Sequence, residues 1–181
     1  MENQKFQIKI NEPKYILPRG GGHNLMSIFS TCFEFPKNDF DVVFNDMTIG
    51  FSYKYEVPYI IYPILEMLNS ICSSNSGKCK AYIGVEEILS EWNLQWETEN
   101  LRLQINWERT SNDFLEQLNE IEELNINLNH FVSEWYKLIH LIDRIIKESN
   151  IQIDDLYYIG DFQNVKKKIL KKIESKKTKD D

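Results

Sequence analysis

The clearest pattern in the chain is the alternation of apolar and polar residues between Glu91 and Arg109. A period of two with one polar face is typical of half-buried antiparallel strands. A turn at residues 97–100 would place all seven large apolar side chains on one face, where a shift of one residue would expose half of them. The resulting pairs are Trp96 with Leu101, Leu94 with Leu103, and Trp92 with Ile105. The sequence therefore predicts a β-hairpin with an apolar face that another element must cover.

Shorter stretches of the same kind predict further strands before the hairpin. They cover residues 6–10, 27–35, 40–44, 49–55 and 80–85. Between them, apolar residues recur at helical spacing after Pro63, and proline suits the first turn of a helix but not its interior. We therefore expect a helix from Tyr62 to about Cys72, followed by a polar loop over residues 73–77.

Two helical patterns follow the hairpin. The first is a short amphipathic helix with Phe114, Leu115, Leu118 and Ile121 on one side, which we expect to end at the asparagine-rich residues 125–129. The second spans about 127–148 and is the longest in the chain. Its apolar stripe consists of Leu128, Phe131, Val132, Trp135, Leu138, Ile139, Ile142, Ile145 and Ile146. We expect this stripe to lie on the hairpin face that bears Trp92, Trp96 and Trp107.

A last, lysine-rich helix is predicted after Gly160, with Val165, Ile169, Leu170 and Ile173 on one side. Taken together, the pattern predicts an α+β fold, in which an antiparallel sheet with strands mostly in residues 4–109 carries helices on one face. We expect one α+β domain over residues 1–165 and a lysine-rich helix end and tail over residues 166–181.

The distribution of charge limits the classes of partner that we expect the protein to bind. The net charge is −7, yet eight lysines lie from Lys166 onward, so the rest of the chain is more acidic than the total suggests. An acidic body argues against nucleic acid, because phosphates need a basic surface, and is compatible with a basic protein partner. No apolar run reaches the length of a membrane span, and the first residues lack the apolar core of a signal peptide, so we expect a cytoplasmic protein without a membrane partner. Three cysteines outside CxxC spacing, Cys32, Cys72 and Cys79, are expected to be free thiols, although a Cys72–Cys79 bridge stays open.

The chain carries no recognisable catalytic or metal-binding motif. The three glycines at residues 20–22 lack the spacing of a phosphate loop and suit a flexible loop or wide turn. His23, His130 and His140 do not form a zinc motif, and His130 and His140 fall off the apolar stripe, which suggests solvated side chains. We expect no catalytic residues, no metal ligands and no cofactor. An enzyme with an unrecognised site is the remote alternative.

Acidic residues are concentrated in and around the hairpin. The candidate partner-binding residues are Glu86, Glu87, Glu91, Glu97, Glu99, Glu108 and Asp113. Several of these carboxylates could converge on the polar side of the hairpin and steer a basic protein towards it. The alternative is a solvated rim without a binding role.

Three stretches carry a resemblance to a known group of proteins: residues 40–51, the PILEMLNSI run at 63–71, and LRLQINW at 101–107 with the helices after it. Over most of residues 40–150 the layout resembles a loose group of small bacterial proteins, many of them suspected immunity proteins of toxin–immunity systems. The group has no set of functional residues to transfer, and the lysine-rich tail and the triple-glycine loop are not among its features. The resemblance implies a non-enzymatic protein that binds and occludes a cognate toxin. A secretion chaperone or adaptor is the alternative.

Overall fold

The computed structural model describes residues 5–11, 33, 40–85, 88–110, 115–121, 123–149 and 156–177, with the side chains of 149, 156–160 and 175–177 left aside. Its strands form two antiparallel sheets. The small sheet, in the order β1-β2-β3, contains β1 (Phe6–Ile10), β2 (Phe40–Phe44) and β3 (Met47–Phe51). The large sheet, in the order β4-β5-β6-β7, contains β4 (Ser76–Val85), β5 (Ile88–Glu97), β6 (Asn100–Arg109) and β7 (Leu124–Asn127). The helices of the described part are α2 (Val57–Ser73), α3 (Leu115–Asn119), α4 (Leu128–Ser149) and α5 (Leu156–Lys177). The predicted α+β class is confirmed.

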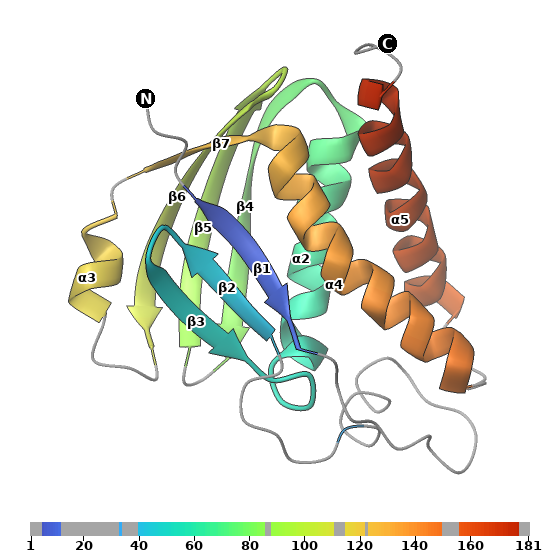
Figure 1. The fold of residues 1–181 in the computed structure, drawn as a ribbon, viewed down its shortest axis with the longest axis horizontal. Coiled ribbons are helices and arrows are strands. Elements are labelled where there is room, and N and C mark those ends of the chain that lie inside the picture. Colours follow the sequence, from blue (N-terminus) through green and yellow to red (C-terminus); the bar gives the residue numbers. More distant parts are fainter. Residues whose placement is uncertain are drawn as a thin grey trace.

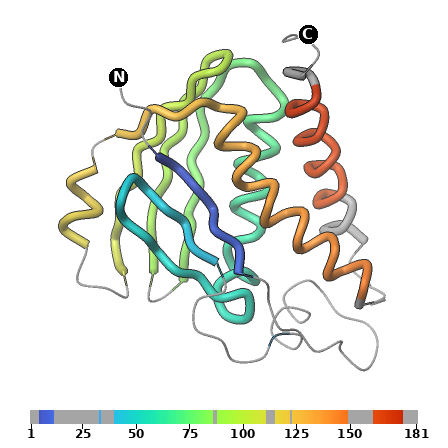
Figure 2. The backbone as a smooth tube through the Cα atoms, in the orientation of Figure 1, coloured from blue at the N-terminus to red at the C-terminus, as the bar shows by residue number. Residues whose placement is uncertain are grey.

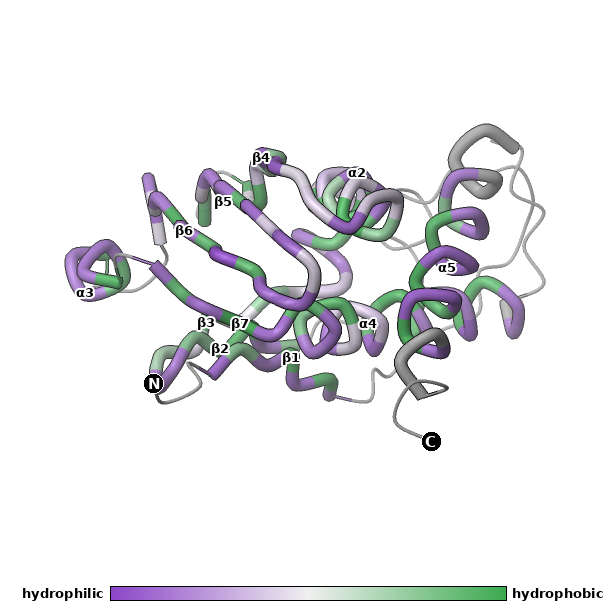
Figure 3. Tube along the Cα trace, turned by 90° about the horizontal axis from the view of Figure 1, so that it is seen from above, coloured by the Kyte–Doolittle hydropathy of each residue, from purple (hydrophilic) through white to green (hydrophobic). Residues whose placement is uncertain are grey.

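The sheets and helices form two layers (Figure 1). The small sheet and α4 lie in front of the large sheet, whereas α2 lies beside β4 at the back (Figures 1 and 3). Helix α5 contacts both α2 and α4 and so joins the layers at one end. In the trace of Figure 2, α4 crosses the front diagonally and α5 runs back in the opposite direction at one end of the molecule. None of the helices in the described part is long and apolar enough to cross a membrane.

The tryptophan hairpin has the predicted register. Trp92 pairs with Ile105, Leu94 with Leu103, and Trp96 with Leu101. The expected cover by α4 is confirmed at Trp92, whose ring centroid lies 5.9 Å from that of Trp135. The small sheet also covers part of this face, because Phe44 of β2 makes edge-to-face contacts with Trp92 and Trp107. The core is therefore a sheet-on-sheet contact extended sideways by a helix, and not a single sheet covered by helices alone.

Helix α2 begins five residues before the predicted start, so the placement of Pro63 in its first turn was wrong. Pro58 occupies the first turn instead, where a missing N–H costs nothing. Pro63 lies inside the helix and removes one backbone hydrogen bond. Burial of Val57, Ile60 and Ile61 in the preceding turn compensates for that loss.

The chain after the hairpin also differs from the prediction. The short helix shrinks to α3, in which Leu118 is the one fully buried residue. Residues 124–127 form β7, which pairs with β6 from Leu103 to Asn100, where the asparagines had indicated a break. Beyond the end of β7, the side chain of Asn119 takes the place of a neighbouring strand. Its Oδ1 accepts from the Trp107 N–H at 2.9 Å and its Nδ2 donates to the Trp107 carbonyl at 3.0 Å.

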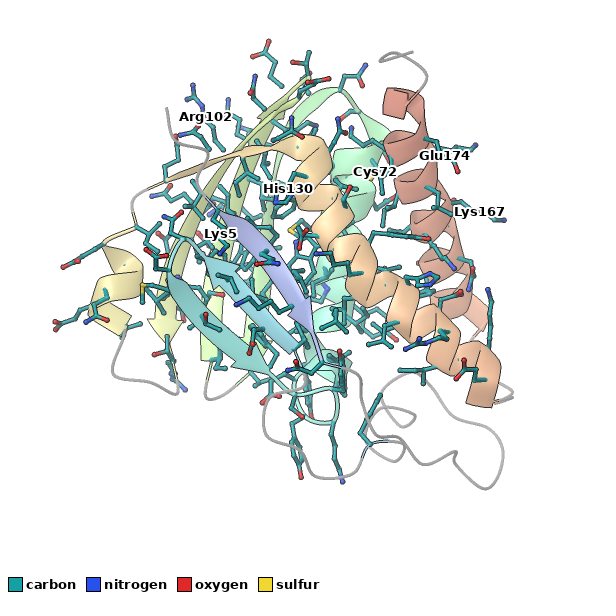
Figure 4. All side chains as sticks on the ribbon, viewed as in Figure 1. Lys5, Cys72, Arg102, His130, Lys167 and Glu174 are labelled. Carbon is teal, nitrogen blue, oxygen red and sulfur yellow. The ribbon has the colours of Figure 1, made fainter. Side chains whose placement is uncertain are left out.

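Helix α4 covers the free edge of β1 with two side chains one turn apart. Glu134, which is buried, accepts a hydrogen bond from the Ile8 N–H at 2.8 Å and pairs with Lys137. His130 lies at the start of α4 beside β1 (Figure 4) and places Nε2 2.7 Å from the Phe6 carbonyl, so this nitrogen carries the proton. The edge of the small sheet is thereby closed to further strands.

Helix α5 is fastened to both neighbouring helices by lysines. Lys166 pairs with the buried Asp143 of α4, which also binds Lys147, one turn further along α4, at 2.8 Å. Lys168 donates to Asn69 Oδ1, and Lys172 to the Ile71 carbonyl, both at the C-terminal end of α2. That end has no basic residue of its own in its last turn, so the lysines of α5 complement its negative dipole. The predicted boundary between residues 165 and 166 falls inside this continuous helix.

Several predictions concern residues outside the described ones. They are the strand at 27–35 apart from Phe33, the glycine loop at 20–22 with His23, Cys32, and the last residues of the chain. Phe33 itself is buried and stacks on Tyr53 with centroids 5.2 Å apart.

Candidate functional site

The large sheet has one face packed into the core and one face turned away from it. On the second face, which we call the outer face, the side chains are exposed or half-buried along β4, β5 and β6. In Figure 3, no element of the described part is drawn beyond β4, β5 and β6 on this side. An uncovered sheet face of three ten-residue strands is a surface large enough to contact another molecule.

The antiparallel register arranges the outer face in rows that cross the strands. The first row holds Ser76, Glu97, Asn100 and Asn127; the second Lys78, Gln95, Arg102 and Asn125; the third Lys80, Asn93 and Gln104; and the fourth Tyr82, Glu91 and Asn106. Neighbours within a row lie about 4.8 Å apart, and successive rows lie about 6.6 Å apart along a strand.

Glu91 accepts three hydrogen bonds from neighbouring side chains of the outer face. It accepts hydrogen bonds from Tyr82 Oη at 2.7 Å, from Asn93 Nδ2 at 2.9 Å and from Lys80 Nζ at 3.1 Å. These bonds, that of Asn93 foremost, lower the pKa of Glu91 to about 2. The pKa of Tyr82 rises in return, chiefly through its bond to Glu91. Tyr82 keeps 57% of its surface exposed, so an oriented aromatic ring stands on an otherwise polar face.

The other candidate carboxylates do not converge on Glu91. Glu97 lies at the last position of β5, and Glu99 in the turn that follows, six to eight residues further along the chain. Six residues of strand correspond to roughly 20 Å. Glu108 lies near the Glu91 end and raises the pKa of Tyr82 electrostatically. The structure therefore forms two acidic groups at opposite ends of the outer face, Glu91 with Glu108 and Glu97 with Glu99. Glu86, Glu87 and Asp113 lie outside the described residues.

Between the acidic groups lie three cations that sequence reasoning did not single out. Lys78 and Lys80 come from β4 and Arg102 from β6, and all three line an open depression of about 450 Å³. The signal was the alternation of Lys78, Lys80 and Tyr82, which extends the period-two pattern to a residue before the predicted start of this strand at residue 80. Strand β4 begins at Ser76, so residues 76 and 77 of the predicted polar loop belong to it. The described outer face is thus mixed in charge, although the chain as a whole is acidic.

The thiols and histidines of the described part offer no alternative centre. Cys72 and Cys79 are free, and burial raises the pKa of each thiol to about 11, so both are protonated at neutral pH. Among the described residues, no three His, Cys, Asp or Glu side chains gather in a group that could hold a metal ion.

Comparison of the chain with models of known protein families, with curated proteins and with solved structures gave no match. The outer face of the large sheet is therefore the site on which a functional argument can be built from this structure.

Proposed function

We propose that this chain is a non-enzymatic, cytoplasmic protein that recognises another protein through the outer face of its large sheet. The observation that carries the proposal is a sheet face that no described element covers, with an acidic group at each end. A sheet surface with hydrogen-bonded polar groups and an exposed tyrosine suits a protein partner, because groups that are already held in place lose little side-chain entropy on binding.

The partner class follows from charge and from the resemblance described above. Two acidic groups roughly 20 Å apart would steer a partner with basic side chains and fix its orientation. A toxic effector domain of basic character, such as a nuclease, meets this requirement. The chain would then act as an immunity protein that binds the toxin and occludes its active or substrate-binding surface.

The proposal is tested by identifying the genes beside that of this chain and co-expressing the chain with any toxic effector that they encode. We expect cell survival to be restored and the two proteins to elute together in size-exclusion chromatography. Failure of both would overturn the immunity function. Binding of a secreted protein without any effect on growth would favour a secretion chaperone or adaptor instead.

The contribution of the acidic groups is tested by reversing Glu97, Glu99 and Glu108 to Lys, since all three are exposed. Exposed substitutions change stability by about 0.5 kcal/mol or less, so a slower, less salt-sensitive association would report on binding alone. Glu91 is better changed to Gln, because a lysine there would face Lys80. A control for the position of the charge reversal is Lys167→Glu with Lys171→Glu, on exposed positions of α5. Lys137 is unsuitable as a control because it pairs with Glu134 beneath β1.

A further inference from the structure

The middle of the outer face has the opposite charge to its ends. In the second row, Gln95 of β5 pairs with Lys78 on one side and with Arg102 on the other. Two inter-strand spacings, about 10 Å, therefore separate the two cationic residues at the backbone. Their long side chains can both reach a group placed over Gln95.

The charges of Lys78 and Arg102 are available to a ligand. Lys80, one row away, is paired with Glu91 at 3.1 Å. Lys78 and Arg102, by contrast, make no ion pair within the part of the chain that the structure describes. In the same part, the side-chain amides of Gln95 and Gln104 have no hydrogen-bond partner, so both can donate to an anion.

The depression that these residues line is of a size that holds a ligand group. Its volume of about 450 Å³ lies within the range of about 300–1,000 Å³ found for ligand pockets. It is bordered by Lys78, Lys80, Asn93, Gln95, Arg102, Gln104 and Glu123. The floor is therefore supplied by three strands of a rigid sheet, which keeps the donors in place before binding.

The surroundings decide which anion fits. Glu123 lines the depression, and the two acidic groups flank it along the strands. A long polyanion such as nucleic acid would extend over both acidic groups and be repelled there, whereas a short segment can place a carboxylate over Lys78 and Arg102 without covering those groups. The guanidinium of Arg102 can bind such a carboxylate with two parallel hydrogen bonds.

We propose that this depression binds a carboxylate-bearing segment of the protein partner, with Arg102 and Lys78 as the charged ligands and Gln95 and Gln104 as further donors. The inference rests on the proposed function and specifies it: the partner surface carries an acidic group between two basic ones. A partner with a uniformly basic surface would leave Lys78 and Arg102 facing like charge.

The test uses hexaglutamate and hexalysine peptides as probes of the two kinds of site. In ¹⁵N-¹H spectra of the full chain, we expect hexaglutamate to shift the resonances of Lys78, Gln95, Arg102 and Gln104 in a saturable way. A dissociation constant of about 1 mM or tighter is expected at low salt. Hexalysine should instead shift residues around Glu97, Glu99 and Glu108.

The decisive variant is Lys78→Gln with Arg102→Gln, and its matched control is Lys167→Gln with Lys171→Gln. Figure 4 shows Arg102 and Lys167 on different sides of the molecule, so both variants remove two positive charges from well separated surfaces. We expect the first to weaken hexaglutamate binding about tenfold or more and the second to leave it nearly unchanged. Arg102→Lys should retain part of the affinity, since it keeps the charge and loses the two-pronged geometry.

Three results would overturn the inference: no saturable shift with hexaglutamate, shifts spread equally over Lys167 and Lys171, or equal loss in the two double variants. Binding of hexalysine at the acidic groups in the same experiment would leave the proposed function standing. If hexalysine does not bind but hexaglutamate binds specifically in the depression, the proposed basic partner is wrong and the proposed carboxylate site stands.

Discussion

At the scale of single residues, two buried tryptophans differ in the hydrogen bonding of their indole N–H groups. Trp92 and Trp135 are both fully buried and in contact with each other. Trp92 Nε1 donates to Ser90 Oγ at 2.9 Å, and Ser90 Oγ in turn donates to the Ile83 carbonyl at 2.8 Å. Among the described residues, nothing accepts a hydrogen bond from Trp135 Nε1.

This difference predicts unequal costs for the same substitution. Replacing either tryptophan by Phe removes a similar volume, but Trp92→Phe also breaks a buried hydrogen bond, whereas Trp135→Phe removes an unpaired donor. We expect Trp92→Phe to destabilise the protein by about 1–2 kcal/mol more than Trp135→Phe, measured from urea denaturation midpoints. In a Ser90→Ala background the difference should shrink. Equal costs, or the reverse order, would contradict this account of the core.

The residues that sequence could and could not identify differ in where their partners lie. Period-two alternation was sufficient for the hairpin register, because the pairing residues are close in the chain. It could not reveal that Phe44 covers Trp107, since the two are far apart in sequence and no local pattern links them. The same holds for the site. The glutamates were visible as a composition, but their division into two ends and the cations between them follow from the register of four strands.

At the scale of elements, the most important contact is that of α4 with β1, in which two side chains of α4 satisfy backbone groups at the free edge of the strand. The spacing of His130 and Glu134 on one helix face is readable from the sequence, yet their partners are backbone atoms of Phe6 and Ile8 more than a hundred residues away. A spacing typical of metal ligands thus serves to satisfy the free edge of a strand. Strand β7 was not predicted for a related reason. Its four residues form a strand because they pair with β6, and not because of a strand propensity of their own.

The closure predicts a contrast between two substitutions of Glu134. Gln keeps an oxygen that can accept from the Ile8 N–H, whereas Leu leaves this buried donor without a partner. We expect Glu134→Leu to cost about 1–3 kcal/mol more than Glu134→Gln in chemical denaturation. Amide exchange at Ile8 should also accelerate in the Leu variant. If Ile8 exchanges at the same rate in both variants, the contact is not closing the edge.

The junction of α4 and α5 predicts a loss of stability in acid. Burial alone would raise the pKa of Asp143, but hydrogen bonds from Lys147, Lys166 and Gln163 outweigh it and lower the pKa from 3.8 to about 2. Because the folded value is the lower one, the stabilising contribution is present above about pH 4 and is lost as the pH falls towards 2.

Denaturation midpoints over this window should fall less steeply for Asp143→Asn than for the unchanged chain. Glu91→Gln is the necessary companion variant, since the pKa of Glu91 is depressed too. Parallel pH profiles for Asp143→Asn and the unchanged chain would exclude a role for this cluster in acid stability.

At the scale of the whole molecule, α5 holds the two layers together. It contacts α2 and α4, one from each layer, and its lysines bind partners on both. The sequence pattern predicted a lysine-rich helix end and tail outside the folded domain from residue 166 onward. The structure places Ile169 in the core between these lysines, with no exposed surface. Lysines that alternate with a buried apolar stripe can therefore be docking residues, and composition alone does not distinguish them from a solvated tail.

Two truncations test whether the lysine-rich C-terminal region is docked on the core or is a solvated tail. Cutting after Lys172 removes the half-buried Ile173 and the residues beyond it, and should lower the melting temperature by only a few degrees. Cutting after Val165 removes Ile169 together with the contacts of Lys166, Lys168 and Lys172. We expect this longer cut to lower the melting temperature by about 10 °C or more, since loss of one buried isoleucine alone costs about 2–5 kcal/mol. Ile169→Ala in the full chain is the reference variant and should fall between the two. If the chain cut after Val165 melts within a few degrees of the full one, then residues 1–165 are the folded unit that the sequence pattern predicts, and α5 only rests on its surface.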